Sequence, residues 1–224
     1  MVADRATSAM DFWQGRAEAG TRRGVLLDRG LMTRRMTGVG DRGATRKLHL
    51  GCGAKHIPGF LHVDGNPHPH VDVQGPVDRL PFLADASVDL IYAAHLLEHF
   101  GRAEVDGVLA EWYRVLAPGG VLRLAVPDYA ACARLYVEGK LANGLPDILG
   151  LMMGGQRDHY DYHKMVFDRP SLDARLRRIG FRETRLWDWR TTEHAGLDDY
   201  SQAYLPHMDK TGGVLVSLNM EAVK

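Results

Sequence analysis

The sequence predicts a doubly wound α/β fold, built on a mostly parallel sheet with helices on its faces. A first apolar run, residues 48–50, leads into Gly51-Cys52-Gly53, and a second ends in the carboxylate of Asp64. Further along, short apolar runs alternate with helical patterns, which indicates right-handed βαβ crossovers. Glycines after a first strand allow a ligand close to the backbone, and an acid after the second can accept hydrogen bonds from ribose hydroxyls. Together these features predict a nucleoside pocket.

Strands are expected where short runs are apolar or β-branched. Residues 87–94 are mostly apolar, as a strand that is buried on both faces of a parallel sheet requires. A closing strand near the end of the chain is expected to run antiparallel to the others. The predicted strands are residues 48–50, 61–64, 71–73, 87–94, 121–126, 183–189 and 213–218.

The clearest helix is predicted over residues 102–116. Its apolar side chains recur at the i, i+3, i+4, i+7 spacing of one buried helix face, and a proline followed by two glycines ends the pattern. Two further helices are expected at residues 129–138 and 171–179, the second of which is bounded by a proline and a glycine. The apolar stripe of the first helix consists of Val105, Val108, Leu109, Trp112, Val115 and Leu116.

Composition and charge are those of an ordinary globular protein. The 224 residues carry 28 basic and 28 acidic side chains, so no net charge directs the chain to nucleic acid or to an anionic membrane. No apolar run reaches the ~18 residues of a membrane span. Of the two cysteines, Cys52 lies inside the glycine loop, where a disulfide would distort the turn. Reduced thiols and a cytoplasmic location are therefore expected.

Residues 1–45 differ from the remainder of the chain. They are rich in arginine and glycine, so we expect a flexible or loosely docked extension with helical turns at 10–19 and 24–36. A solvated tail or a cap over the ligand is the favoured interpretation, and an arm that binds nucleic acid or a membrane is the alternative. Residues 46–224 are expected to form a single domain.

Four motifs follow one another between residues 46 and 130. They are Leu48-His49-Leu50-Gly51-Cys52-Gly53; His62-Val63-Asp64; Asp78-Arg79-Leu80-Pro81-Phe82 with the next strand and His95-Leu96-Leu97-Glu98-His99; and Glu111-Trp112-Tyr113-Arg114-Val115-Leu116-Ala117-Pro118-Gly119-Gly120. In this order they resemble the class I S-adenosylmethionine-dependent methyltransferases, of the type 11-like kind. Later stretches are similar to a bacterial subgroup of predicted small-molecule methyltransferases: Gly154-Gly155-Gln156, His159-Tyr160-Asp161-Tyr162-His163-Lys164 and Ser217-Leu218-Asn219.

This resemblance implies a Rossmann-like sheet that binds S-adenosyl-L-methionine and releases S-adenosyl-L-homocysteine. The sequence departs from the family at His49, where an acid is common, and at Lys55, where a third glycine is usual. Its first crossover can hold barely one helical turn. We therefore expect the cofactor's carboxylate to contact loop amides and Lys55. Asp64 is implied to hold the ribose. The implied cofactor-binding residues are Gly51, Cys52, Gly53, Asp64, Asp78, Leu80, Ala94 and His95.

Methyl transfer requires mainly that donor and acceptor are held in line, and a hydroxyl acceptor also has to lose its proton. The resemblance implies a hydroxyl or amine acceptor on a small molecule or glycan intermediate. Residues from about 140 to 204 are expected to shape its site. No nucleic-acid partner is expected, and the oligomeric state stays open. The candidate bases are His95, His163 and His159, of which the first two are favoured, with His99 a further candidate and Asp128 and Asp161 as partners.

Three alternatives compete with this interpretation. A non-catalytic nucleoside-binding or scaffold protein would share the glycine loop and Asp64. A zinc metallohydrolase would use His95-Leu96-Leu97-Glu98-His99, which also spells an inverted zinc-peptidase motif, but that motif needs a helix and here a buried strand runs directly into it. We therefore expect no metal site. A nicotinamide-dependent dehydrogenase is disfavoured because His56 stands where its third glycine belongs.

Overall fold

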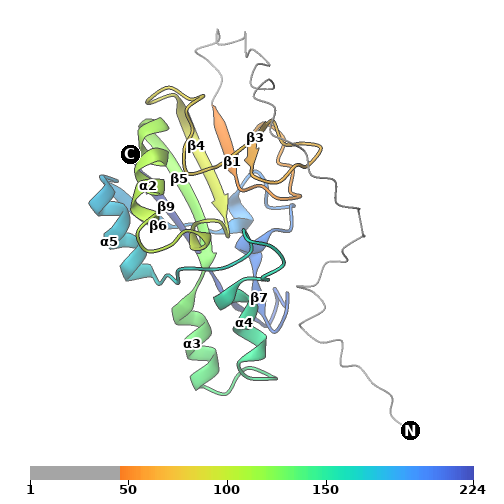
Figure 1. Cartoon of the computed structure of the whole chain (residues 1–224). Coiled ribbons are helices and arrows are strands. Elements are labelled where there is room, and N and C mark those ends of the chain that lie inside the picture. The colour runs from red at the N-terminus through yellow and green to blue at the C-terminus, as the bar shows by residue number, and fades with distance from the viewer. Residues whose placement is uncertain (1–45) are drawn as a thin grey trace. The chain divides into compact units, whose positions relative to one another are not determined.

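The computed structural model describes residues 46–224, which belong to one compact unit (Figure 1). Its centre is a seven-stranded sheet, and four α-helices accompany it in this part of the chain. The predicted extension and its helical turns lie outside the described residues. The sheet strands are β1 (Lys47–Leu50), β2 (Leu61–Asp64), β3 (Val73–Gln74), β4 (Val88–Ala94), β5 (Leu116–Pro127), β6 (Glu183–Leu186) and β9 (Ser217–Val223), and the helices are α2 (Val105–Val115), α3 (Tyr129–Val137), α4 (Pro146–Met153) and α5 (Arg169–Ile179).

The sheet has the strand order β3-β2-β1-β4-β5-β9-β6. Neighbouring strands from β3 to β5 pair in parallel, whereas β9 runs antiparallel to both β5 and β6. The doubly wound, mostly parallel sheet with one antiparallel closing strand is thus confirmed. From β1 the strands are added outward on one side, to β2 and β3, and from β4 they are added on the other side. The carboxyl ends of β1 and β4 therefore flank a topological switch point, where α/β sheets bind ligands.

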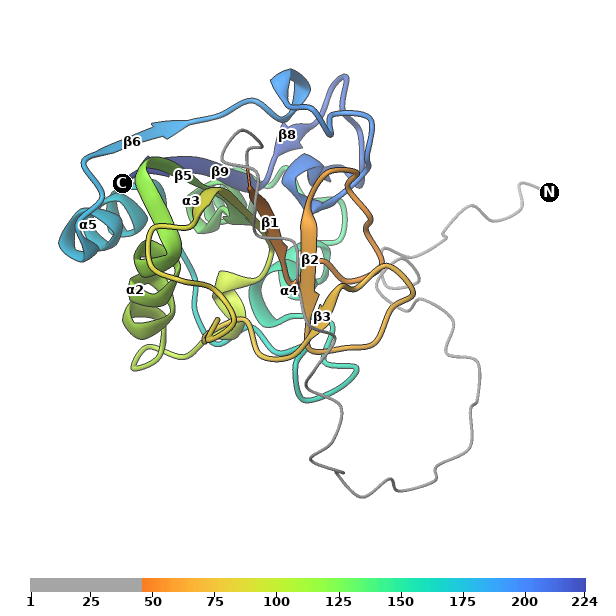
Figure 2. The ribbon, with the colours of Figure 1, turned by 90° about the horizontal axis from the view of Figure 1, so that it is seen from above.

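Helices α2 and α5 cover one face of the sheet (Figure 2). The predicted stripe of α2 is buried against it, and Trp112 is fully buried with its Nε1 donating to the Val77 carbonyl at 2.8 Å. A capping box formed by Asp168 and Ser171 starts α5, which buries Leu172 and Leu176 in the same core. This face carries the main hydrophobic core.

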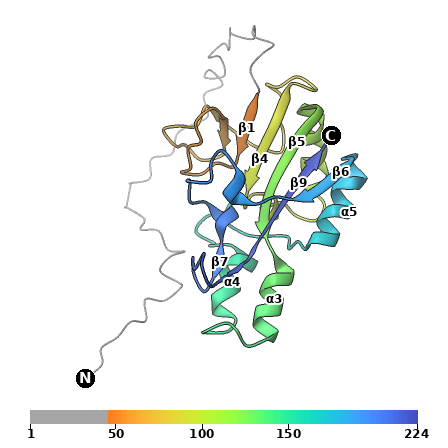
Figure 3. The ribbon, with the colours of Figure 1, turned by 180° about the vertical axis from the view of Figure 1, so that it is seen from behind.

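The other face of the sheet is covered without an α-helix between β1 and β2. Residues 187–203 return from β6 across this face toward β1 (Figure 3). They include two short 3-10 turns, η2 (Trp189–Thr191) and η3 (Tyr200–Gln202). Trp187 and Leu197 pack there against a small apolar cluster. The short first crossover expected from the sequence is therefore complemented by a segment more than a hundred residues away. The cluster consists of Ile57, Phe60, Leu90 and Tyr92.

Two predicted boundaries differ from the structure around α2. The helix starts at Val105 rather than at residue 102, because residues 102–104 form a turn in which the Glu104 carboxylate accepts from the Gly101 amide at 2.6 Å. Strand β5 starts at Leu116 rather than at residue 121, since Leu116 already pairs with Val88 across an irregular register. The proline and glycines that end the helix thus lie inside the strand.

The predicted closing strand at 213–218 is wrong in its position. Val214–Leu215 (β8) pairs instead with Tyr204–Leu205 (β7) in a separate two-stranded sheet, and the closing strand is β9. Strand β9 is hard to recognise because Glu221 is buried at 5% exposure, where the guanidinium groups of Arg123 and Arg185 bond its carboxylate at 2.8 and 2.9 Å. Helix α4 was not predicted, since eight residues are too few for a periodic pattern.

Helices α3 and α4 lie beyond the carboxyl ends of β4 and β5 (Figure 1). The chain between them and α5 therefore returns past the edge where strands β1, β2 and β4 end. Within residues 46–224, no helix combines the length and the apolar composition that crossing a bilayer requires.

Candidate active site

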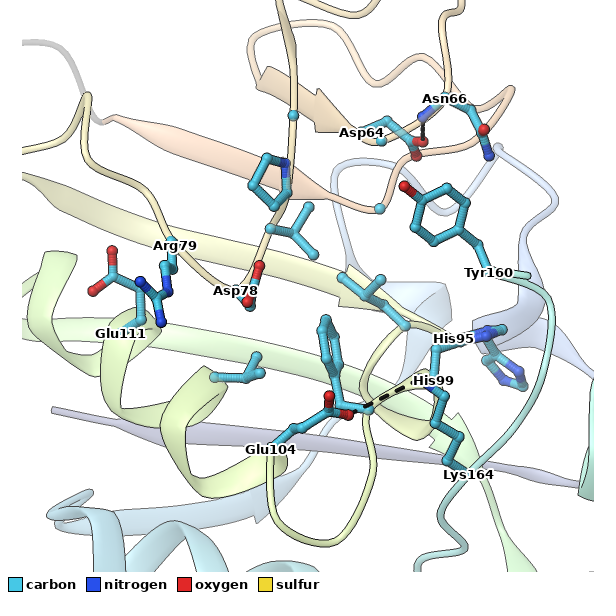
Figure 4. A pocket seen from close by; sticks show the side chains of 18 of the residues that line it. Asp64, Asn66, Asp78, Arg79, His95, His99, Glu104, Glu111, Tyr160 and Lys164 are labelled. Carbon is cyan, nitrogen blue, oxygen red and sulfur yellow. Dashed lines mark hydrogen bonds and ion pairs between the residues drawn. The ribbon is translucent and has the colours of Figure 1, made fainter. Parts of the chain in front are cut away.

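A cavity of about 1380 Å³ opens at the carboxyl ends of β1, β2 and β4 (Figure 4). Three strand ends contribute to its wall: Gly51 follows β1, Asp64 ends β2, and His95 follows β4. A second side consists of the loop 157–161 together with Lys164 and Tyr200, and residues from the ranges 75–81 and 103–114 form a third. The cavity is therefore lined both by the predicted cofactor motifs and by the segment that was expected to shape the acceptor site.

Glycine is needed at positions 51 and 53 of the first loop for different structural reasons. Gly51 and Gly53 have φ angles of +61° and +50°, in the left-handed region that favours glycine. A Cβ atom on Gly51 would lie 2.6 Å from a Leu96 methyl group, so this glycine permits close packing behind the cavity. A Cβ atom on Gly53 would meet nothing within 4 Å. Gly53 therefore leaves its backbone accessible from the cavity.

Asp64 holds the glycine loop against the end of β2. Its Oδ2 accepts from the Gly53 amide at 2.7 Å and its Oδ1 from the Asn66 amide at 2.7 Å, and the residue is 7% exposed. Each carboxylate oxygen has a second lone pair, so both can accept one further hydrogen bond from the cavity side. The predicted pairing of a glycine bend with a carboxylate is present in the structure.

The predicted cofactor residues divide into two groups. Those that line the cavity are Gly51, Gly53, Asp64, Asp78 and His95. The other three, Cys52, Leu80 and Ala94, do not line it.

The residues outside the cavity wall have other contacts. Burial, and next Asp64, raise the pKa of the buried Cys52 thiol to about 12. Leu80 is fully buried in the core, and its amide donates to a Glu111 carboxylate oxygen at 2.6 Å, so it is not free for a ligand. Lys55, expected near the cofactor's carboxylate, instead donates to the Asp198 carbonyl on the covering segment 187–203. Loop contacts of this kind leave no signal in the local sequence.

Four histidines were candidates for the base, and three of them, His95, His99 and His159, line the cavity. His95 has a φ angle of +50°, and its Nε2 lies 3.2 Å from the Ser217 hydroxyl of β9. Burial, followed by the neighbouring His163 and His99, lowers the pKa of His95 well below its usual value. The His95 ring is therefore neutral at pH 7.

His163 stands behind the cavity wall, where its Nδ1 lies 2.9 Å from the Leu151 carbonyl. Burial and His99 lower the pKa of His163 to about 4. His159 is exposed, and its ring lies 3.8 Å from the ring of Tyr160. Of the proposed carboxylate partners, Asp161 lines the cavity, whereas Asp128 caps α3 by accepting from the Ala131 amide.

Glu98 is a further candidate for a functional residue. The sequence predicted it only as part of the inverted zinc-peptidase motif and not on its own. It is fully buried, and burial raises the pKa of its carboxyl group to about 8. It lies in η1 (Leu97–His99), a single 3-10 turn. Because His95 has a positive φ and precedes this turn, His95 and His99 do not share a helix face. The helical arrangement that the inverted zinc-peptidase motif requires is absent here.

The comparison with protein families gives a match in the first half of the sheet. Residues 53–124 match the family of methyltransferase domains. Over these residues the chain is similar to that family. The match starts in the glycine loop and ends inside β5, and so includes Asp64 and the strand that leads into His95. None of the curated proteins matches the sequence.

Solved structures agree with the family in fold. A SAM-dependent methyltransferase from Archaeoglobus fulgidus is similar with a TM-score of 0.52 at 15% identity, over 81% of this chain and 87% of that one. A SAM-dependent methyltransferase from Thermotoga maritima, described as a possible histamine N-methyltransferase, has a TM-score of 0.50 at 16% identity, over 80% and 82%. The part of the chain that the structure describes thus shares a Rossmann-like fold with these structures.

Proposed function

We propose that this protein transfers a methyl group from S-adenosylmethionine to a hydroxyl or amine of a small molecule or glycan intermediate. The observation that carries the proposal is the contact between Asp64 and the Gly53 amide at the edge of the cavity. A nearly buried carboxylate with spare lone pairs suits two ribose hydroxyls, and the open space before Gly53 suits the methionine part of the cofactor.

The chemistry asks the chain mainly to align two molecules. When bound, the cofactor supplies an electrophilic methyl group on a sulfonium. The residues Gly51, Gly53 and Asp64 hold this donor from one side, and the loop 157–161 shields the cavity from the other. We assign to His95, which lies in the wall directly after β4, the role of receiving the acceptor's proton at a ring nitrogen.

The wall that faces the strand ends supports a polar acceptor. It presents the aromatic rings of Tyr160 and Tyr200 together with His159, Asp161 and Lys164. Rings and hydrogen-bonding groups in such a mixture suit a hydroxylated or amine-bearing molecule. Tyr160 reaches across to the end of β2, since its Cζ lies 3.8 Å from where a Gly65 Cβ would stand.

Calorimetry with S-adenosylhomocysteine tests the cofactor assignment. The full chain should bind one equivalent, and Asp64→Ala should weaken binding by roughly 1–3 kcal/mol, or 5- to 150-fold, because the ribose hydroxyls lose their acceptor. Asp89→Ala is the matched control, because Asp89 is an exposed acid outside the cavity wall whose carboxylate accepts from the Arg46 amide. Failure of the intact chain to bind this ligand would overturn the assignment.

A screen of hydroxyl and amine metabolites and glycans with a labelled methyl donor tests the transfer itself. His95→Gln should reduce the turnover number while leaving the affinity for S-adenosylhomocysteine unchanged. His56→Gln, at an exposed histidine outside the cavity wall, should change neither quantity. Binding of the nucleoside without transfer to any acceptor class would instead support the scaffold alternative.

A further inference from the structure

Glu98, His99 and His163 form a cluster beside the cavity. Each offers one ligand atom, and these atoms all lie within 4.8 Å of one another. Two residues come from the turn after β4, and the third comes from the loop between α4 and α5. The rings of His99 and His163 stand at 87° to each other with centroids 4.7 Å apart, so they do not stack.

The cluster contains an unusual buried carboxylate. Glu98 has no exposed surface, and neither carboxylate oxygen has a hydrogen-bond partner in the described part of the chain. The ring nitrogens nearest to Oε1 are His95 Nδ1 at 3.4 Å and His163 Nε2 at 3.8 Å, too far or too poorly directed to bond it. A buried carboxyl group without partners is costly as an anion, so it either keeps its proton or is compensated by a bound cation.

Each of the two histidines can offer one ring nitrogen to a metal ion. The Nδ1 of His163 lies 2.9 Å from the Leu151 carbonyl, which can only accept, so Nδ1 carries the proton and Nε2 keeps its lone pair toward Glu98. Metal-binding histidines usually donate their second nitrogen to such an acceptor. In His99, Nδ1 is buried and has no partner among the described residues.

Backbone hydrogen bonds hold the two segments together. The amides of Lys164 and Met165 both donate to the Glu98 carbonyl, at 2.8 and 3.1 Å, and the His163 amide donates to the Met153 carbonyl at 3.1 Å. The three ligand side chains therefore project from a fixed backbone frame rather than from a free loop. Such a frame is what a preorganised ligand set requires.

We propose that Glu98, His99 and His163 bind one divalent transition-metal ion. Two imidazoles and one carboxylate are the donors of open Zn²⁺ sites and of non-haem Fe²⁺ sites. An ion there compensates the carboxylate and occupies the orphaned lone pairs. Because His99 also lines the cavity, the ion stands in its wall, where a remaining coordination position is available to a water or an acceptor oxygen. This set differs from the helical motif seen in the sequence, since His163 replaces His95 as a ligand.

Metal titration of the full chain tests the proposal without requiring methyl transfer. After treatment with a chelator, the protein should bind one equivalent of Co²⁺ with visible absorption bands of nitrogen and oxygen ligation, and Zn²⁺ should displace it. Glu98→Gln and His163→Gln should each weaken Co²⁺ binding at least about 10-fold. Loss of a residue that only hydrogen-bonds to a metal ligand already costs about that much, and loss of a ligand itself should cost no less. His159→Gln, in the same loop but outside the cluster, should bind Co²⁺ like the wild type.

Controls separate lost ligands from lost structure. Metal-free Glu98→Gln should melt no lower than the metal-free wild type, because an isosteric amide replaces an unpartnered buried acid, and its far-ultraviolet circular dichroism should be unchanged. The proposal is overturned if the wild type binds no stoichiometric Co²⁺ or Zn²⁺, or if both folded variants bind as tightly as the wild type. Because the readout is metal binding, a negative result here does not affect the cofactor assignment, which calorimetry with S-adenosylhomocysteine tests separately.

Discussion

Two walls of the cavity, the strand ends and the side formed by residues 157–164 with Tyr200, are built in different ways. The wall of strand ends is local: Gly53 and Asp64 are eleven positions apart, and one hydrogen bond joins them. The wall that faces it brings together residues from two loops, with Tyr200 more than forty positions from Asp158. A strand-end wall can bind a common cofactor with a short motif, whereas the loop wall depends on tertiary contacts and is free to vary with the acceptor.

The largest expected effect concerns the loop wall. Gly154 has a φ angle of +79°, and a Cβ atom there would lie 2.3 Å from the Asp161 carbonyl oxygen, a backbone atom that cannot rotate away. Gly154→Ala should therefore lower the free energy of unfolding by about 3 kcal/mol, measured by urea denaturation. Gly139→Ala, with φ +65° and open space around the site, should lose only about 1–2 kcal/mol. Equal losses would show that the loop wall is not rigid.

An intermediate effect concerns the strand-end wall. In Gly51→Ala the new methyl group meets the flexible Leu96 side chain, which also lines the cavity and has to move into it. We expect the affinity for S-adenosylhomocysteine to fall about 10-fold, or ~1.4 kcal/mol, by calorimetry. The double variant Gly51→Ala, Leu96→Ala should recover part of that loss. Unchanged affinity in the single variant would place Leu96 outside the ligand's space.

The smallest effect concerns neither wall and serves as a reference for acid unfolding. Burial alone would raise the pKa of Glu193, but bonds to Lys47 and Arg123 outweigh it and lower this pKa to about 2. Because the folded pKa lies below the unfolded value, the ion pairs stabilise the fold above about pH 4.5 and lose this effect as the pH falls toward 2.

Stability of the wild type and of Glu193→Gln between pH 7 and pH 2 checks this. Since more than a third of the Glu193 side chain is exposed, the difference at pH 7 should not exceed about 1 kcal/mol, and it should vanish near pH 2. Glu183→Gln, a more exposed acid in β6, should show a smaller difference. A difference that persists at pH 2 would mean that packing, not charge, is lost.

Local patterns predicted the elements that bury a regular face. The strand 61–64 and the start of α3 at Tyr129 agree with the structure, and β4 and α2 differ only at their ends, because each has the apolar period of its type. Strand β9 was misplaced because the arginines that compensate Glu221 come from β5 and β6, far away in the chain. Lys55 was misassigned for the same reason, since its partner lies on the covering segment 187–203.

The sequence by itself determined the doubly wound sheet, the bend at Gly51 and Gly53, and the acid that holds it, because strand periodicity and left-handed glycines are properties of neighbouring residues. Only the tertiary structure decided that Glu98 is buried without a partner and that His163 returns beside it. Burial and charge compensation depend on which distant segments pack together, and no spacing along the chain records that.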